Sequence, residues 1–83
     1  MEDILIKVRE AFHVAFDVDP QLVTIDTVPD QIPGWDSMGH VALASSLERI
    51  FVLNFDVDEL MEMENVQKIV QIIKSKKETP KND

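Results

Sequence analysis

The chain has 83 residues, which suffice for one small domain with a single core but leave little room for a deep substrate pocket. It contains no cysteine, so disulfides and thiolate metal sites are excluded, and this absence is compatible with any compartment. Sixteen acidic and eight basic residues give a net charge of −8, which disfavours nucleic acids and anionic membranes and suits either basic partners or solubility alone.

Residues 2–16 are predicted to form the first helix. Glu2 and Asp3 favour its start because the helix dipole stabilises negative charge there. His13 lies off the apolar stripe, so we expect it to be solvated. This segment mixes charge with apolar residues and no apolar run approaches membrane-spanning length, so we expect no signal peptide, no membrane insertion and a cytoplasmic location. The stripe that we expect to be buried comprises Ile4, Leu5, Val8, Ala11, Phe12 and Ala15.

Residues 17–36 are predicted to form a long connection, because three of the four prolines of the chain and Gly34 interrupt any helix there. Pro20 follows Asp19, a pair that favours a short helical turn. A connection of this length is unusual in a small domain and indicates an ordered or functional loop, which Trp35 is expected to anchor. Its apolar residues, expected to pack over the core, are Leu22, Val23, Ile25, Val28, Ile32 and Trp35.

Residues 37–52 show the second long helical pattern. Asp36 is the predicted N-cap, since its short side chain can accept the free N–H groups of the first turn, and Ser37 then takes the first helical position. We expect one buried face made of Val41, Ala44, Leu47, Ile50 and Phe51, with Leu43 beside it.

The remainder predicts one short and one long helix after an apolar break at residues 53–55. Asp56 to Met61 favour about one helical turn, with Leu60 and then Met63 turned inward. Asn65 is the predicted N-cap of a last helix, whose apolar stripe is Val66, Ile69, Val70 and Ile73. Residues 74–83 are charged, their lysines are expected to be solvated, and we expect a domain over residues 1–76 with a frayed tail over 77–83.

These elements together predict an all-α fold. The expected architecture is a small, monomeric four-helix bundle with three main helices, one short helix and a long first loop. Calcium-loop-like starts at residues 17–19 and 56–58 lack Asp or Asn at the fifth position and glycine at the sixth, so no metal site is predicted.

Asp36, Ser37 and His40 supply the residue types of a catalytic triad, and Ser37 and His40 share a helix face. Asp36 is committed to capping, however, and Trp35 stands where the nucleophile-elbow pattern needs its first glycine. Hydrolase chemistry is therefore disfavoured, no catalytic residue is predicted, and His40 is expected to be a surface residue. A purely structural role, in which this stretch only caps the helix, remains the main alternative.

Asp36-Ser37-Met38, at the start of the second helix, resembles the Asp-Ser-Leu attachment motif of acyl carrier proteins. The resemblance covers most of the chain: a first amphipathic helix, a proline-bearing loop, the motif, Leu47 and Phe51 in the helix core, and a short helix before Asn65-Val66. It implies an acyl-carrier-like bundle that is not an enzyme. A phosphopantetheinyl transferase, using magnesium and coenzyme A, would attach 4′-phosphopantetheine covalently to Ser37.

The resemblance also implies partners and roles. The thiol of the arm would carry acyl groups as thioesters between enzymes of fatty-acid, polyketide or related specialised biosynthesis, and Asp36 would help the transferase to position its metal and Ser37. Acyl-processing enzymes with basic docking patches are the implied partners. For Val41, packing in the core is an open alternative to docking. The implied docking residues are Met38, Val41, Glu48, Met61 and Glu62.

Several residues depart from the usual carrier pattern. Met38 replaces a leucine, Gly39 weakens the first turn, and Val52 stands where a glycine often ends the helix, so Asn54 or another device must end it. Asp-Ser-Met-Gly also resembles D-alanyl carrier proteins, which leaves an aminoacyl or D-alanyl-type carrier as an alternative. An unmodified acidic helical interaction module is a further alternative.

Overall fold

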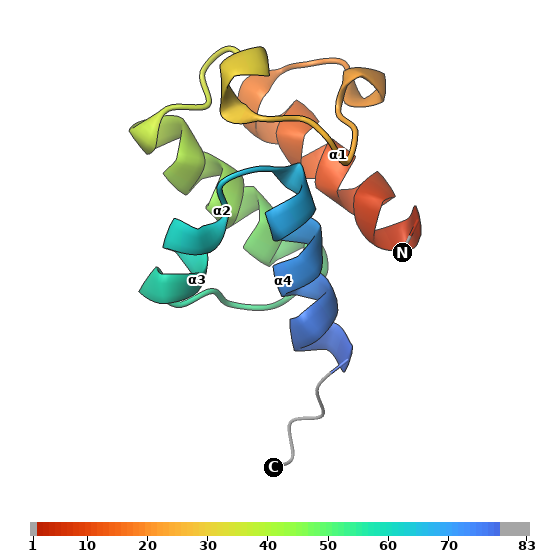
Figure 1. The fold of residues 1–83 in the computed structure, drawn as a ribbon, viewed down its shortest axis with the longest axis vertical. Helices are drawn as coiled ribbons and strands as arrows, with labels where there is room; N and C mark the ends of the chain where they lie inside the picture. The colour runs from red at the N-terminus through yellow and green to blue at the C-terminus, as the bar shows by residue number, and fades with distance from the viewer. Residues whose placement is uncertain (1, 79–83) are drawn as a thin grey trace.

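The computed structural model describes residues 2–78, which form an all-α bundle (Figure 1). Within these residues there are four α-helices and no strand, so the predicted class, with three main helices, one short helix and a long first connection, is confirmed. None of the described helices combines the length and apolar character that a membrane crossing requires. The elements in chain order are α1 (Glu2–Phe16), the 3₁₀ turns η1 (Pro20–Leu22) and η2 (Pro29–Gln31), α2 (Ser37–Phe51), α3 (Val57–Glu62) and α4 (Val66–Glu78).

The core is one cluster of apolar side chains contributed by α1, α2, α4, the first connection and Met63, which follows α3. The predicted stripe of α1 is confirmed: its middle residues are fully buried, and Ile4, Leu5 and Ala15 pack at its edges. The stripe of α4 is buried throughout, as its helical spacing predicts. The buried residues of these two helices are Val8, Ala11, Phe12, Val66, Ile69, Val70 and Ile73.

The predicted buried face of α2 is right at Ala44, Leu47 and Phe51 but wrong at Val41. Val41 is exposed, whereas Leu43, expected at the edge, is fully buried. Successive residues lie about 100° apart around a helix, so a face centred on Leu43 and Leu47 turns Val41 toward solvent. The buried residues of α2 are Leu43, Ala44, Ser46, Leu47 and Phe51.

The first connection is an ordered, bonded segment that crosses one end of the bundle (orange to yellow in Figure 1). The predicted turn at Asp19-Pro20 is η1, whose start is capped by Asp19. The Arg9 side chain donates a hydrogen bond from Nε to the Val23 carbonyl oxygen over 2.7 Å. At the other end, the Val66 amide donates to the carbonyl oxygen of buried Thr27 over 3.1 Å. The connection is therefore attached to both α1 and α4.

Most of the expected apolar contacts of this connection are present. Val23, Ile32 and Trp35 are buried, whereas Leu22 and Val28 are exposed, contrary to expectation. The single turns η1 and η2 are too short to bury a face, and no residue within either is buried. His13 is exposed as expected, but it is not merely solvated, since its Nδ1 lies 3.1 Å from the Val18 carbonyl oxygen.

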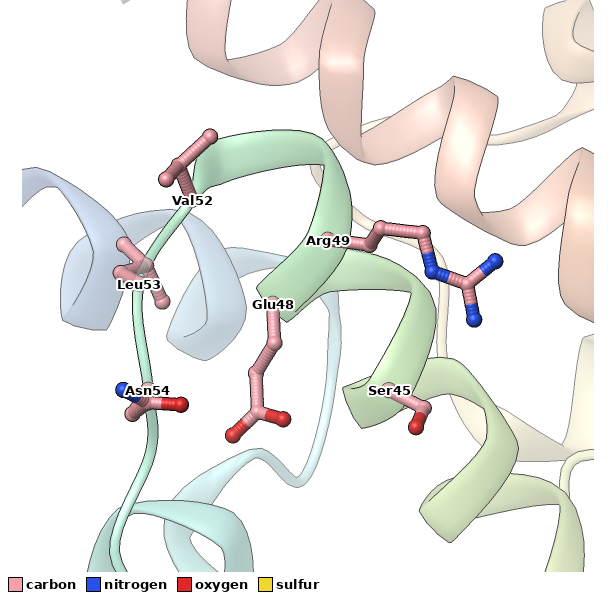
Figure 2. Close-up of a pocket in the computed structure, with 6 residues that line it drawn as sticks. All are labelled: Ser45, Glu48, Arg49, Val52, Leu53 and Asn54. Carbon is pink, nitrogen blue, oxygen red and sulfur yellow. The ribbon is translucent and has the colours of Figure 1, made fainter.

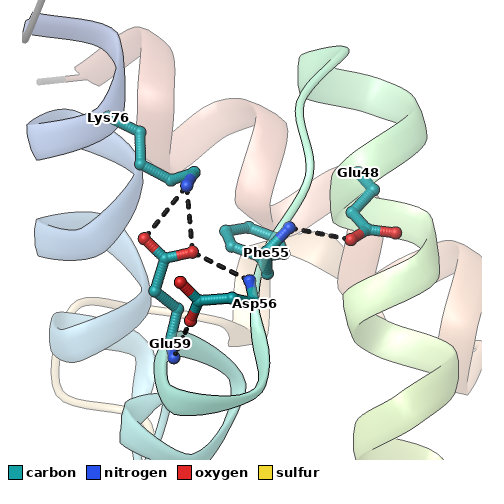
Figure 3. Close-up of polar contacts among 5 residues, drawn as sticks. All are labelled: Glu48, Phe55, Asp56, Glu59 and Lys76. Carbon is teal, nitrogen blue, oxygen red and sulfur yellow. Dashed lines mark hydrogen bonds and ion pairs between the residues drawn. The ribbon is translucent and has the colours of Figure 1, made fainter.

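Polar side chains hold α3, none of whose residues is buried (Figure 3). Asp56 and Glu59 form a capping box, in which each carboxylate accepts the amide proton of the other residue. Lys76 of α4 lies 2.9 Å from both carboxylate oxygens of Glu59, so this lysine is not simply solvated as expected. Just before α3, the Phe55 amide donates to Oε2 of Glu48 on α2 over 2.9 Å.

The last helix starts where predicted, and the two apolar residues expected to turn inward before it do so. Oδ1 of Asn65 accepts the Lys68 amide proton over 2.8 Å, which confirms the N-cap. Leu60 is half-buried and Met63 is buried against the core. The helix continues to Glu78 and so includes the first two residues of the expected tail, while residues 79–83 lie outside the described part.

The end of α2 uses an uncommon device. Val52 adopts the left-handed conformation (φ 56°, ψ 59°), and its amide donates to the Glu48 carbonyl oxygen. The Leu53 amide bonds to the same oxygen over 3.1 Å, so of the two expected alternatives the helix ends by a device other than Asn54. A β-branched residue in this conformation is strained, and the Val52 side chain is 88% exposed, so burial does not offset that strain.

Candidate functional site

The candidate site is the start of α2, where Ser37 is presented to solvent. Asp36 is the N-cap as predicted: its Oδ1 accepts the Gly39 amide proton over 2.9 Å, and its carbonyl oxygen accepts that of His40 over 2.7 Å. Ser37 takes the first helical position and is exposed. Within residues 2–78 its hydroxyl makes no hydrogen bond. An external reagent or enzyme therefore has direct access to that hydroxyl.

Two glycines bring the loop against the first turn of α2. Gly34 has a positive φ of 91°, a conformation that a side chain would disfavour. A Cβ atom at position 39 would overlap the Gly34 carbonyl oxygen and lie 2.8 Å from the Phe16 ring. Gly39 is thus required by the chain's own loop, a role that neither helix propensity nor partner contact explains.

Trp35 anchors the loop directly before the site, as predicted. It is 7% exposed and meets the Phe12 ring edge-on, with centroids 5.0 Å apart and planes at 82°. The Phe16 ring is a second neighbour of Trp35, at a centroid distance of 6.4 Å. Aromatic contacts with α1 therefore fix the backbone from which Asp36 and Ser37 follow.

His40 is not the surface residue that the sequence predicted. It is half-buried, and the indole N–H of Trp35 donates to its Nδ1 over 2.9 Å. Its Nε2 lies 2.9 Å from the carbonyl oxygen of Leu60 on α3. Because Nδ1 accepts, Nε2 must donate, which fixes one neutral tautomer. Neither nitrogen is left to take the proton of Ser37, and this removes the geometric argument for a Ser-His pair.

A shallow groove of about 430 Å³ lies beside Ser37. Its walls come from three parts of the chain: the first connection, the start of α2, and α3 with the residue that follows it. Most of the lining side chains are apolar, so the groove suits an apolar or amphipathic group attached nearby. The lining residues are Pro29, Trp35, Asp36, Ser37, His40, Val41, Leu60 and Met63.

Exposed apolar side chains occur on α2 and α3, the two helices that contribute to this groove. Met38 is 84%, Val41 60% and Met61 72% exposed, so packing of Val41 in the core, the alternative to docking, is wrong. Glu62 is exposed beside Met61, as is Asp58 on the same short helix. Exposed apolar side chains among carboxylates favour a partner with a basic rim.

Glu48, also predicted to bind partners, lies away from these residues. It follows Ser37 by eleven positions, which separates the two by about 16 Å along a helix. One of its oxygens is already bonded to the Phe55 amide, so Glu48 has a structural role that the sequence did not predict. Figure 2 shows Glu48 at a separate hollow of about 440 Å³, lined also by Ser45, Arg49, Val52, Leu53 and Asn54.

The described part of the chain contains no group of three or more His, Asp or Glu side chains that could hold a metal ion. Comparison with known protein families found no family model that matches the chain, and a search of curated proteins found no match. The function is therefore inferred from the fold and from the geometry around Ser37.

Proposed function

We propose that this protein is an acyl carrier protein, in which Ser37 bears a 4′-phosphopantetheine arm whose thiol carries acyl intermediates as thioesters. The observation that carries the proposal is the exposed, unbonded Ser37 hydroxyl on a capped helix start. The all-α bundle with a long, ordered first connection supports it, and so does the apolar groove beside the serine.

The residues around Ser37 fit a phosphodiester at its hydroxyl. The Ser37 and Met38 amides belong to a first helical turn, whose N–H groups lack acceptors within the helix and favour a phosphate. Asp36 caps the helix through Oδ1, and its Oδ2 makes no hydrogen bond within residues 2–78, so Oδ2 is available to a transferase-bound magnesium ion. The arm supplies the thiol that this cysteine-free chain lacks.

The attachment step uses few groups of this chain. Ser37 Oγ forms a bond to the β-phosphorus of coenzyme A while the phosphoanhydride bond breaks and adenosine 3′,5′-bisphosphate leaves. The serine proton must pass to a base of the transferase, because both ring nitrogens of His40 are engaged. This chain contributes position and access: the cap fixes Ser37, and Trp35 fixes the preceding loop.

Partner enzymes would dock on the surface around the groove. Met38, Val41 and Met61 offer exposed apolar contacts, and the carboxylates of Asp36 and Glu62 complement basic patches. The net charge of −8 would attract such partners over longer distances.

Intact-mass measurement tests the proposal. The folded protein is incubated with coenzyme A, magnesium and a broad-specificity phosphopantetheinyl transferase, beside Ser37→Ala and the matched control Ser45→Ala, which alters an exposed serine of the same helix. We expect one arm on the unaltered protein and on Ser45→Ala, and none on Ser37→Ala. No arm on the folded, unaltered protein would refute the carrier function and favour an unmodified interaction module. An arm on Ser37→Ala would refute the site.

The cargo is tested separately on the modified protein. Loading with acyl groups favours the acyl carrier, whereas selective loading with an amino acid such as D-alanine favours the aminoacyl-type carrier. Hydrolysis of a simple ester by unmodified protein, lost in Ser37→Ala, would instead indicate an enzyme.

A further inference from the structure

We propose that His40 ties α2 to α3 and thereby keeps a group attached at Ser37 in the surface groove, outside the helix bundle. In this role His40 is a positioning residue that selects cargo without reacting with it. The nature of the cargo rests on the proposed carrier function, but the tie itself does not.

The attachment of α3 to α2 depends on few contacts. Within residues 2–78, the His40–Leu60 hydrogen bond is the only side-chain hydrogen bond between these two helices. The remaining polar contacts hold other parts of the segment: Glu59 pairs with Lys76 of α4, and Phe55, which precedes α3, bonds to Glu48. Since no residue of α3 is buried, loss of the His40 bond should loosen this helix.

The His40 ring cannot easily turn aside. Its second nitrogen accepts from Trp35, a buried ring held by Phe12. The two ring planes are nearly parallel, 13° apart, with centroids 6.2 Å apart. Rotation of the imidazole would break bonds to two different elements at once.

The position of this tie restricts where an attached chain can go. Ser37, His40 and Leu60 line the same groove, so a chain that passes from this groove between α2 and α3 at His40 must separate His40 from Leu60. Met63, which lines the groove, and the core residues Leu43 and Leu47 of α2 are at most 2% exposed, so no open path into the bundle is expected there. The groove can hold the first part of a chain, and the rest stays in contact with water. This arrangement favours short or polar acyl groups over long saturated chains.

The absence of cysteine permits a test that needs neither a transferase nor coenzyme A. Ser37→Cys introduces a single thiol, to which methyl or decyl methanethiosulfonate attaches a short or a long alkyl chain as a disulfide. Two readouts follow the chain: amide hydrogen exchange over residues 57–62, and acrylamide quenching of Trp35, the single tryptophan, which lines the groove.

With His40 in place, we expect decyl and methyl adducts to show the same exchange over residues 57–62 within about twofold, and the decyl adduct to protect Trp35 from acrylamide. A tenfold or larger change in that exchange, or altered methyl NMR signals of Leu43 and Leu47, would overturn the proposal, because the chain would then have entered the bundle. Unaltered quenching would also overturn it, because the chain would not lie in the groove.

Variants of His40 in the Ser37→Cys background test the tie directly. His40→Phe keeps an aromatic ring without nitrogens, and we expect at least tenfold faster exchange over residues 57–62 together with decyl-dependent shifts at Leu47. His40→Gln keeps a donor and should remain closer to the parent, and His13→Phe is the control for loss of a histidine. Unchanged exchange in His40→Phe would refute the tie. If His40→Phe does not fold, the proposal is tested by two other comparisons of exchange over residues 57–62. The first compares His40→Gln with the parent, and the second compares the decyl with the methyl adduct of the parent.

Failure of this test and failure of the carrier function are distinguishable. The alkyl disulfides form on any folded chain with the new thiol, so a negative result here refutes the tie alone. Absence of mass gain with coenzyme A refutes the carrier function alone.

Discussion

Replacing Gly39 with alanine tests whether the loop and α2 fit as closely as the structure indicates. Helix propensity alone predicts that Gly39→Ala stabilises the protein, because alanine in a helix interior is favoured over glycine by about 1 kcal/mol. The structure predicts the opposite, since the new methyl group would overlap the Gly34 carbonyl oxygen and crowd the Phe16 ring.

The expected loss in the free energy of unfolding follows from the movement of the Gly34 backbone that the new methyl group requires. The contact has to lengthen to about 3.5 Å, so the backbone at Gly34 must retreat from the helix. Overpacking of this kind costs about 1–3 kcal/mol, and the propensity gain of about 1 kcal/mol offsets part of it. We therefore expect the free energy of unfolding to fall by about 1 kcal/mol, which lowers the melting temperature by roughly 4–8 °C in a domain of this size.

Urea denaturation followed by circular dichroism gives this free energy, and the emission of Trp35 reports displacement of the loop. The matched control is Ala42→Gly, an exposed position of the same helix, which measures the propensity difference without a clash. If Gly39→Ala stabilises the protein by about as much as Ala42→Gly destabilises it, the close approach of Gly34 is refuted.

Three further substitutions have defined outcomes in the same urea assay. Val52→Gly should raise the free energy of unfolding by about 0.5–1 kcal/mol, because relief of left-handed strain exceeds the entropy that glycine adds to the unfolded chain, and a loss would contradict the strain. Trp35→Phe keeps the ring against Phe12 but removes the donor to His40, so we expect a loss of about 1–2 kcal/mol, whereas no loss would show that this hydrogen bond contributes nothing. Lys76→Met should cost less than about 1 kcal/mol and reduce the salt dependence of stability, and an unchanged salt dependence would contradict a stabilising ion pair.

Local rules were sufficient to predict the helices and the N-caps of α2 and α4, but not the left-handed end of α2 at Val52. Asp36 and Asn65 act on amides three residues away, so the residue type and its place before an apolar stripe identify them as N-caps. The stripes of α1 and α4 follow from helical spacing in the same way. The exposure of Ser37 followed from its position directly after the cap.

Local rules could not predict contacts between segments that are distant in the sequence. His40 bonds to Leu60, twenty residues later, and no spacing rule relates them. Gly39 is required by a loop carbonyl that lies close only in the folded chain. On α2, apolar residues occur on two adjacent faces, so local spacing left Val41 and Leu43 as competing candidates for the core, and tertiary packing selected Leu43.

The attachment of the first connection to two helices affects when, during folding, the start of α2 around Ser37 reaches its final geometry. Arg9 fastens this segment to α1 and Thr27 fastens it to the start of α4, so it cannot open without disturbing two helices. Most surface loops unfold locally at little cost, but we expect the segment before Ser37 to open only together with its contacts to α1 and α4. An enzyme that recognises the folded start of α2 would therefore discriminate between complete and partly folded chains, and a nascent chain would gain the correct geometry at Ser37 only after α4 has been synthesised and has docked.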